Sequence, residues 1–388
     1  MNIDFTYHNP TCVHFGKNAL DYLPGELSHY GPEVLLVYGK QSIRKSGLYD
    51  TLIRVLKDCG KNVRELPGIN SNPRYAQVME GARMVREQHT DLLLAVGGGS
   101  VIDCCKAISA SAYCEGDPWS IYWEHGEALR NPVVPVGCVL TMCGTASEMN
   151  SGSVITHEEK KLKLGRVFPL AEMTPRFAII NPELTYSVPE YQMVSGIFDI
   201  FSHLMEQYFG GEDDCVSDYL LEGCMLALIS AARKAKQNPL DYEARSNIAW
   251  CATMALNKIL AVSKKQDWEV HQIEHQIGAY CDCAHGIGLA VISVPYYRMQ
   301  YRYGLPRFER FARNVWKVGT EGKSGEQIAL EGIECLSRFI DEMGIPRRLR
   351  DLGCTEDMLP LIAESCNKTG DYHVPTTAEV LEVLKACY

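Results

Sequence analysis

A change in hydrophobic pattern near residue 185 is the feature that most restricts how this chain can fold. Before it, short apolar runs alternate with segments that carry a helical spacing of apolar residues. Strands that alternate with helices predict a parallel sheet with helical crossovers. The strand-like runs lie at 5–7, 12–15, 34–38, 63–66, 91–96, 132–140 and 177–180, and the helix-like segments at 46–59, 72–89 and 101–114.

After residue 189 the pattern is helical throughout, with no convincing strand. A chain of 388 residues has room for two or three domains. We therefore predict an α/β fold, with a Rossmann-like parallel-sheet domain for dinucleotide binding at 1–185 and an all-helical, metal-binding domain at 186–388. The expected helices of the second part cover 190–209, 215–236, 243–262, 267–281, 286–301, 307–317, 325–343 and 376–386.

Composition excludes several classes of protein. The chain is 46% hydrophobic and 22% charged, as in ordinary globular proteins. Its net charge of −10, with no block of lysine or arginine, argues against a nucleic-acid partner. No apolar run approaches a membrane span and the N-terminus lacks a signal-peptide pattern, so we expect no membrane partner and a cytoplasmic location.

Sixteen cysteines are many for such a chain. A chain of this length can build a core without disulfides, so we expect reduced and mostly buried thiols. Cys281 and Cys283 lie near three histidines, but their spacing is not that of a zinc knuckle.

A glycine-rich turn, Gly97–Ser100, lies between a buried strand and a helix. Glycines allow a backbone to approach a ligand closely and to adopt positive φ. Free amides at the start of the following helix then favour an anion such as a phosphate. The alternative is a plain tight turn, but three consecutive glycines exceed what a turn needs.

The turn after the first buried strand bears on the choice of nucleotide. An acidic residue at this place often binds the adenosine ribose of NAD. Here Gly39 stands there instead, followed by Lys40, Ser42 and Arg44. The missing acid and the nearby cations indicate NADP rather than NAD, and the alternative is a solvated turn with incidental charge.

Histidines in two helical segments form the most informative constellation. His271 and His275 are four residues apart, and His285 follows after a short break. An upstream helix carries Asp199 and His203, also four apart, so each pair shares one helix face. Both segments are otherwise apolar, and buried polar groups must be paired or bind something. Imidazole and carboxylate ligands suit zinc or ferrous iron.

These motifs together resemble the iron-containing (type III) alcohol dehydrogenase family, especially its butanol dehydrogenase and NADPH-dependent aldehyde reductase branch. The resemblance covers essentially the whole chain. The motifs that carry it are Asn9-Pro10-Thr11 with Phe15-Gly16, Gly97-Gly98-Gly99-Ser100-x-x-Asp103, Thr141-x-x-Gly144-Thr145-x-Ser147-Glu148, Asp199-x-x-x-His203, and His271-x-x-x-His275-x9-His285-Gly286-x-Gly288.

The resemblance implies a set of site residues. One divalent metal, Fe2+ or Zn2+, would be bound by Asp199, His203, His271 and His285. His275 would be the non-ligand histidine that faces substrate and nicotinamide, with a catalytic or an orienting role. Glu148 and Glu274 are interpreted as structural. The cofactor-binding residues would be Gly39, Lys40, Ser42, Asn72, Gly98, Gly99, Ser100, Asp103, Thr141, Met142, Asn150 and Lys163.

The function implied is hydride transfer between NADP(H), with NAD(H) as the alternative, and a small aliphatic alcohol or aldehyde, by a homodimer. The residues expected to line the substrate pocket are mostly apolar or amphipathic: Met142, Asn150, Phe168, Tyr280 and Tyr372. The competing hypotheses are a sugar-phosphate cyclase that resembles dehydroquinate synthase, an NAD-dependent glycerol dehydrogenase, and a non-enzymatic module that binds metal or nucleotide.

Overall fold

The computed structural model of the chain describes residues 4–168, 171–211, 214–262 and 264–388. Contacts within the chain define two compact units: His8–Pro189, and Glu190–Tyr388 together with the residues that precede His8. The functional division expected from the sequence, nucleotide binding at 1–185 and metal binding at 186–388, stays a prediction.

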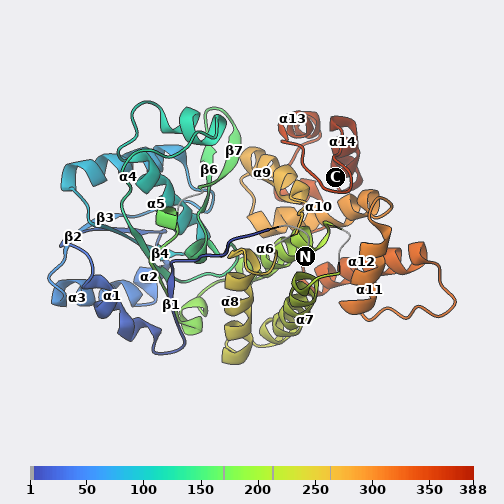
Figure 1. Cartoon of the computed structure of the whole chain (residues 1–388), viewed down its shortest axis with the longest axis horizontal. Helices are drawn as coiled ribbons and strands as arrows, with labels where there is room; N and C mark the ends of the chain where they lie inside the picture. Colours follow the sequence, from blue (N-terminus) through green and yellow to red (C-terminus); the bar gives the residue numbers. More distant parts are fainter. Residues whose placement is uncertain (1–3, 169–170, 212–213, 263) are drawn as a thin grey trace. The chain divides into compact units, whose positions relative to one another are not determined.

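The first unit is built on a six-stranded parallel sheet with the order β1-β8-β5-β4-β2-β3 (Figure 1). Its central strands are nearly continuous apolar runs because a parallel sheet is covered on both faces. A separate antiparallel hairpin, β6–β7, completes the strands. The bounds are β1 Cys12–Phe15, β2 Glu33–Tyr38, β3 Asn62–Leu66, β4 Leu92–Gly97, β5 Val136–Leu140, β6 Gly152–His157, β7 Leu162–Val167 and β8 Phe177–Ile180.

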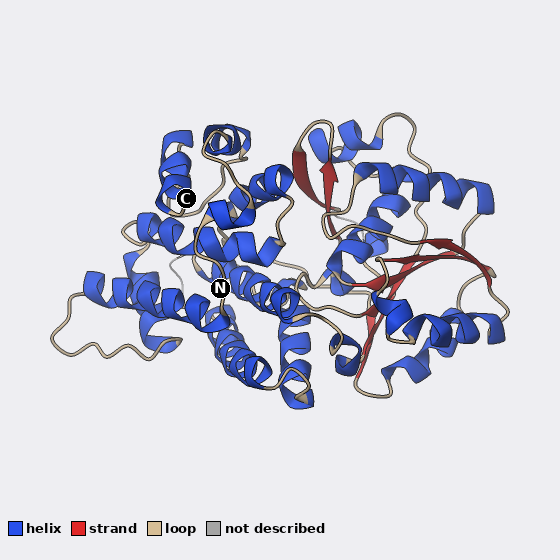
Figure 2. Ribbon diagram, turned by 180° about the vertical axis from the view of Figure 1, so that it is seen from behind, coloured by secondary structure: helices blue, strands red, loops and turns tan. Residues whose placement is uncertain are grey.

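Helices lie on both faces of this sheet, as Figures 1 and 2 show. Alternate residues of a strand point to opposite faces. On one face, Leu36 and Leu94 pack in one buried cluster with Leu52 of α3. Helices α4 and α5 pack together on the other face, and α5 contacts β4. The bounds are α1 Leu23–Leu27, α2 Ser42–Lys45, α3 Leu48–Asp58, α4 Tyr75–Gln88 and α5 Gly99–Ser111.

The expected fold class is confirmed, but some details of the first unit differ from the prediction. The short helices α1 and α2 were not predicted. The strand predicted at 5–7 is wrong: Phe5 and Tyr7 stay exposed and pair with no strand. The hairpin β6–β7 was not predicted. Glycine, serine and lysine residues interrupt the alternation of apolar residues that would predict a strand there. The hairpin is stabilised by antiparallel pairing between its two strands.

The second unit is helical in the part that the structure describes. Its central helix is α6, which is buried from Met193 to Tyr208 and packs against α7, α8, α9 and α10. A helix that is buried all round must be largely apolar, so the few polar groups on it need partners. The bounds are α6 Glu190–Tyr208, α7 Val216–Gln237, α8 Tyr242–Leu256, α9 Glu269–Cys281, α10 His285–Gln300, α11 Leu305–Asn314, α12 Gly325–Met343, α13 Met358–Ser365 and α14 Thr377–Ala386. Helix α13 was not predicted.

All sixteen cysteines are free thiols, as expected for reduced and mostly buried side chains. Among the described residues, no helix combines the length and apolar character needed to cross a membrane.

A buried carboxyl group lies at the start of α9. The two side-chain oxygens of Asp267 accept hydrogen bonds from the hydroxyl of Tyr296 at 3.1 Å, and one also accepts from the amide of Glu269 at 3.0 Å. Burial raises the pKa of Asp267 to about 7, with a further contribution from the charge of Glu206, although the hydrogen bond from the Glu269 amide opposes the shift.

This raised pKa predicts a loss of stability with increasing pH. The folded protein keeps the Asp267 proton up to about pH 7, whereas the unfolded chain loses it near pH 4. The contribution of Asp267 is therefore present below pH 4 and is lost as pH rises to about 7. Asp267→Asn keeps the hydrogen-bond acceptor, so the variant should gain roughly 2 kcal/mol over wild type between pH 5 and pH 8.

Thermal unfolding at both pH values measures this difference, with the exposed Asp357→Asn as the control. An equal difference between Asp267→Asn and wild type at the two pH values would contradict the account.

Candidate metal centre and nucleotide loop

Three imidazole nitrogens surround one carboxylate oxygen in the helical unit. Asp199 and His203 lie one turn apart on α6, and Nε2 of His203 is 3.4 Å from Oδ1 of Asp199. His271 of α9 and His285 of α10 bring their Nε2 atoms to 3.6 Å from the same oxygen. The structure thus brings together all four residues predicted to be metal ligands.

The separations from Oδ1 of Asp199 are close to those between ligands of one cation, and Asp199, His271 and His285 each bring a ligand atom within 4.8 Å of the other two. Oxygen and nitrogen ligands at about 2.1 Å from a tetrahedral zinc ion lie about 3.4 Å apart. Oδ1 of Asp199 and Nε2 of His271 are buried, and neither makes a hydrogen bond within the described part of the chain. Buried polar atoms without a hydrogen bond cost free energy, and a divalent cation would satisfy both.

Two buried glutamates orient the histidines. Nδ1 of His271 hydrogen-bonds to Oε1 of Glu206, and Nδ1 of His285 hydrogen-bonds to Oε2 of Glu274. Because a carboxylate only accepts hydrogen bonds, Nδ1 carries a proton in each ring, and Nε2, which faces Asp199, is the nitrogen left to bind either a second proton or a metal ion. Carboxylates in this position are a common feature of metal sites with histidine ligands.

Sequence reasoning missed Glu206 and treated Glu274 only as structural. Glu206 lies seven residues after Asp199 and three after His203, so it falls on the same helix face. That spacing was the available signal. Ser202 and the amide of His271 also hydrogen-bond to this carboxylate, at 2.8 and 3.1 Å.

Glycines explain how α10 reaches α6. A Cβ atom on Gly286 would lie 1.8 Å from the carbonyl oxygen of Ser195, and one on Gly288 would lie 2.9 Å from Cγ of Glu274. Only glycine therefore permits the first turn of α10 to pack so closely on α6. This packing places His285, the first residue of α10, beside Asp199.

The centre is strongly polarised even without a cation. Burial alone would raise the pKa of Asp199, but His203, His271 and His285 lower it below its usual range. Burial lowers the pKa of His271, yet Glu206 and Asp199 outweigh it and raise the value to about 10. The carboxylates thus favour positive charge at this point, either as an imidazolium proton or as a metal ion.

His275 lies beside the four predicted ligands. Its ring is stacked near that of His285, with centroids 5.7 Å apart, and lies 6.2 Å from that of His271. A second grouping of potential ligand atoms consists of Glu274, His275 and His285. Among the described residues, neither this grouping nor that of Asp199, His271 and His285 includes Cys281 or Cys283.

The predicted nucleotide residues of the first unit gather at the carboxyl ends of three neighbouring strands. Tyr38 pairs with Val96 and Gly97 with Leu140, so β2, β4 and β5 end at the same edge. This edge is where open α/β sheets bind ligands. It carries Gly39 after β2, Gly98, Gly99 and Ser100 after β4, and Thr141 and Met142 after β5.

The glycine loop differs from the expectation in one respect: none of its three glycines has a positive φ. The glycines serve close packing instead. A Cβ atom on Gly99 would lie 2.1 Å from Oγ1 of Thr145, and one on Gly97 would lie 2.4 Å from Cγ2 of Val101. Helix α5 begins at Gly99, so its first amides lie in the loop, as a phosphate site requires.

Two other predicted residues bond within the unit. The carboxylate of Asp103 accepts from the hydroxyl of Ser147 and, at 2.9 Å, from the amide of Val154. The side-chain amide of Asn150 donates to the carbonyl oxygens of Thr145 and Ala146 at 3.1 and 2.9 Å. Both side chains hold the segment that follows β5 against α5, a role that supports the loop.

Lys106, which sequence reasoning did not single out, joins the same network. It is fully buried on α5, and Nζ donates to the carbonyl oxygens of Ser147 and Asn150 at 3.1 and 3.2 Å. Burial lowers its pKa, and the carboxylate of Asp103, 3.4 Å away, opposes that shift. Its neighbours in α5 are mostly apolar, so the sequence pattern of this helix predicts an ordinary hydrophobic core and does not single out Lys106.

The turn after β2 is exposed at Lys40 and Ser42. A Cβ atom on Gly39 would meet only the carbonyl oxygen of Ile69, at 3.9 Å, so a side chain fits there. Arg44, one of the expected cations, is paired with Glu65 at 3.1 Å. It is therefore partly neutralised before any ligand arrives.

Asn72 and Lys163 lie near the hairpin. Thr156 pairs with Lys163 across the hairpin, and its amide donates to the carbonyl oxygen of Pro73 at 2.9 Å, next to Asn72. Both Asn72 and Lys163 are buried. The structure thus brings these two distant positions to one region of the first unit.

Two of the residues expected to line the substrate pocket make other contacts instead. Phe168 is buried among Tyr122 and Trp123, with ring centroids 6.0 Å away in each case, and belongs to an aromatic core. The hydroxyl of Tyr372 donates to the carbonyl oxygen of Gly211 at 2.6 Å.

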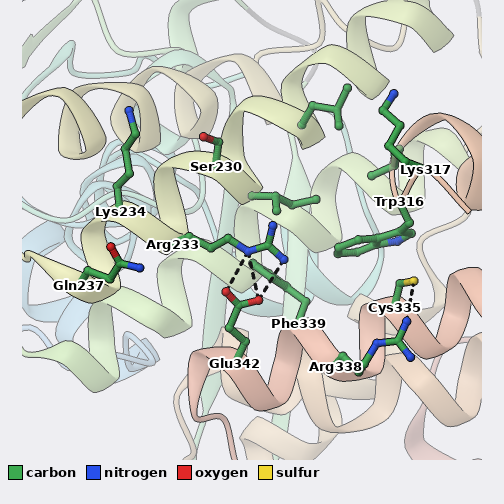
Figure 3. A pocket seen from close by; sticks show the side chains of 13 residues that line it. Ser230, Arg233, Lys234, Gln237, Trp316, Lys317, Cys335, Arg338, Phe339 and Glu342 are labelled. Carbon is green, nitrogen blue, oxygen red and sulfur yellow. Dashed lines mark hydrogen bonds and ion pairs between the residues drawn. The ribbon is translucent and has the colours of Figure 1, made fainter.

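A pocket of about 590 Å3 in the helical unit, drawn in Figure 3, lies elsewhere. Its described lining includes Trp316, Arg233 and Glu342, and none of the predicted site residues. Arg233 and Glu342 form a bidentate ion pair with contacts of 2.8–3.1 Å, which Figure 3 shows.

Comparisons with known proteins agree with this geometry. The family model of the iron-containing alcohol dehydrogenase matches residues 10–182, and that of the Fe-containing alcohol dehydrogenase family, C-terminal, matches residues 193–388. Probable NADH-dependent butanol dehydrogenase 1 of Bacillus subtilis is 41% identical over 387 residues, 99% of each chain. NADPH-dependent aldehyde reductase YqhD of Escherichia coli is 35% identical over 370 residues, 95% of this chain and 94% of the relative.

Among solved structures, NADH-dependent butanol dehydrogenase A of Thermotoga maritima superposes with a TM-score of 0.93 at 33% identity, over 99% of this chain and 98% of that one. The fold, the cluster of potential metal ligands and these relatives together define a class of protein: a metal-containing oxidoreductase with an α/β unit and a helical unit. The chain belongs to the iron-containing alcohol dehydrogenase family. The resemblance stated from the motifs is confirmed, and the cyclase and glycerol dehydrogenase alternatives are not favoured.

The contact between Glu206 and His271 generates a prediction. Glu206→Gln replaces a charged acceptor by a neutral amide, which weakens the orientation of the ring, and metal affinity should fall roughly 10- to 100-fold. Competition with a chelator measures the affinity. Glu222→Gln, another buried glutamate of this unit that bonds Tyr208 and Arg310, is the matched control. Equal metal affinities of the two variants would contradict the role assigned to Glu206.

Proposed function

We propose that this chain catalyses reversible hydride transfer between a nicotinamide dinucleotide and a small aliphatic alcohol or aldehyde. The observation that carries the proposal is the placement of three imidazole nitrogens at 3.4–3.6 Å from Oδ1 of Asp199. The printed names of the B. subtilis and E. coli relatives, a butanol dehydrogenase and an aldehyde reductase, support the substrate class.

The residues of the centre have separable roles. A divalent metal, ferrous iron or zinc, held by Asp199, His203, His271 and His285 would polarise the substrate oxygen, and the nicotinamide would exchange the hydride. Glu206 and Glu274 keep the Nε2 lone pairs of His271 and His285 directed at the centre.

His275 is the residue that we propose to hold or move the proton of the alcohol. It lies one helical turn after His271 and stacks beside His285, so its ring borders the same centre. An imidazole exchanges protons near neutral pH. An orienting hydrogen bond to cofactor or water is the alternative role for this side chain.

The glycine loop is the proposed site of the pyrophosphate. The first amides of α5 and the carboxyl ends of β2, β4 and β5 support this assignment, with Gly98, Gly99 and Ser100 at the phosphates. Asp103 and Lys106 of α5, together with Asn150, fix the segment that follows β5 against α5. The remaining proposed positions are Gly39, Lys40, Ser42, Thr141 and Met142 at that edge, and Asn72 and Lys163 at the hairpin.

We further propose a preference for NADP(H), which Gly39 and the exposed Lys40 and Ser42 support. The names of the relatives point both ways, since the B. subtilis protein is described as NADH-dependent and the E. coli protein as NADPH-dependent. The cytoplasmic location and the homodimer expected from the sequence also stay proposals. Strand β1 at the edge of the sheet is a place where a second copy can add a strand.

Removal of the metal tests the function. The verified metal-free protein should lose turnover with butanal, because polarisation of the carbonyl oxygen is lost, yet should still bind NADPH as measured by its fluorescence. Separate reconstitution with Fe2+ and with Zn2+ shows which ion restores activity. Full turnover by the metal-free protein would overturn the proposal.

Cofactor preference is tested at Gly39. Gly39→Asp places a carboxylate where the 2′-phosphate of NADP would lie, and the ratio of kcat/KM for NADPH to that for NADH should fall by at least about tenfold, since repulsion of roughly 1.4 kcal/mol suffices. Gly39→Asn has the same shape without the charge and serves as the control. An unchanged ratio in the aspartate variant would remove the support for NADP(H).

A further inference from the structure

A second group of potential metal ligands lies in the first unit, apart from the residues around Asp199. Cys12 and His14 are two residues apart on β1, so their side chains emerge on the same face of the strand. Glu26 comes from α1. One ligand atom from each of the three residues lies within 4.8 Å of the other two.

The distances agree in part with a bound zinc ion. Sγ of Cys12 is 3.5 Å from Nε2 of His14. A thiolate and an imidazole on one tetrahedral zinc ion, at about 2.3 and 2.1 Å, are separated by about 3.5 Å. Oε1 of Glu26 is closer to Nε2 of His14, at 2.7 Å, because the two form a hydrogen bond. A small displacement of the carboxylate would therefore accompany binding of the ion.

The scaffold behind these side chains is well fixed. Cys12 pairs with Phe177 of β8, so the backbone of β1 is held in the sheet. The ring of His14 stacks on that of Tyr22 with centroids 4.5 Å apart. Leu23 and Leu27, on either side of Glu26, are fully buried in the core and anchor α1.

We propose that Cys12, His14 and Glu26 form a second divalent metal site, with water as the fourth ligand. A thiolate, an imidazole and a carboxylate together suit zinc and similar borderline ions such as cobalt, and they do not suit magnesium or calcium, which prefer oxygen ligands alone. Exposure of Cys12 gives the ion access from solvent.

Binding releases one proton. The Cys12 thiol loses its proton to solvent as the sulfur–metal bond forms. In the hydrogen bond to Glu26 the proton of the neutral His14 ring lies on Nε2, because a carboxylate only accepts; on binding, this proton moves to Nδ1 by tautomerisation, and Nε2 and the carboxylate each bond to the ion. Without a cation, burial and the neighbouring Glu26 raise the pKa of the Cys12 thiol. The ion must therefore displace this proton as it binds the sulfur. Because Cys12 is exposed whereas Asp199 and His271 are buried, we expect weaker binding here than at the centre around Asp199.

Cobalt provides a direct test, because a cobalt–thiolate bond absorbs in the near ultraviolet whereas the centre around Asp199 contains no thiolate among its proposed ligands. The enzyme with its catalytic metal in place is titrated with Co2+. We expect one further equivalent to bind per chain, with a near-ultraviolet band. Cys12→Ser should abolish the band, and His14→Gln should abolish binding of the additional ion.

Cys59→Ser, a partly buried cysteine of the same unit, is the matched control and should keep both the band and the stoichiometry. Circular dichroism checks that each variant keeps the fold. The proposal is overturned if no band forms, if the band survives in Cys12→Ser, or if Cys59→Ser removes it equally. Retained turnover in Cys12→Ser would agree with a site separate from the catalytic one.

Discussion

The charge of one buried carboxylate governs the helical unit. Oδ1 of Asp199 lies on a helix that is buried all round, where an unpaired charge would cost several kcal/mol. Three imidazoles from α6, α9 and α10 meet that cost by turning their Nε2 atoms toward it. The packing of these helices and the geometry of the centre therefore both follow from the need to compensate the buried charge of Asp199. A divalent ion would bind all four groups together.

Close packing makes this convergence possible. Gly286 lets the start of α10 approach the backbone of α6, and Glu206 and Glu274 hold His271 and His285 in the useful orientation. Glycine also permits close packing in the first unit. There the glycines after β4 make room for Thr145 and Val101, rather than providing positive φ. In both places glycine serves to bring one element against another, and the functional groups gain their positions from that contact.

Buried polar networks lie next to both the centre around Asp199 and the glycine loop, and fix the elements that carry them. Lys106 and Asp103 tie α5 to the segment after β5, on the helix whose first amides are the proposed phosphate site. Around Asp199 the glutamates have the equivalent function. Such networks are most stabilising when every member is satisfied, and around Asp199 a cation would satisfy Oδ1 of Asp199 and Nε2 of His271, which make no hydrogen bond in the described part of the chain. The cluster of Cys12, His14 and Glu26 lacks comparable burial, which is why it is proposed as a weaker, solvent-accessible site.

The sequence by itself determined the fold class through its hydrophobic periodicity and the family through its motifs, because both are local properties of the chain. The i, i+4 spacing pointed to the helices that carry Asp199 and His271, and the choice of four metal ligands came from the family resemblance and stays a prediction. The sequence also predicted the ends of the helices from α6 to α12 within a few residues, except that α8 ends at Leu256, six residues before the predicted end at 262. It missed α13 and the hairpin β6–β7, whose short or polar segments are stabilised by their neighbours, and it wrongly predicted a strand at 5–7. Only the tertiary structure revealed that Glu206 orients His271, that Gly286 sets the place of His285, and that Phe168 is part of a core. Those roles depend on contacts between residues far apart in the chain, and no local pattern records which buried side chains will meet.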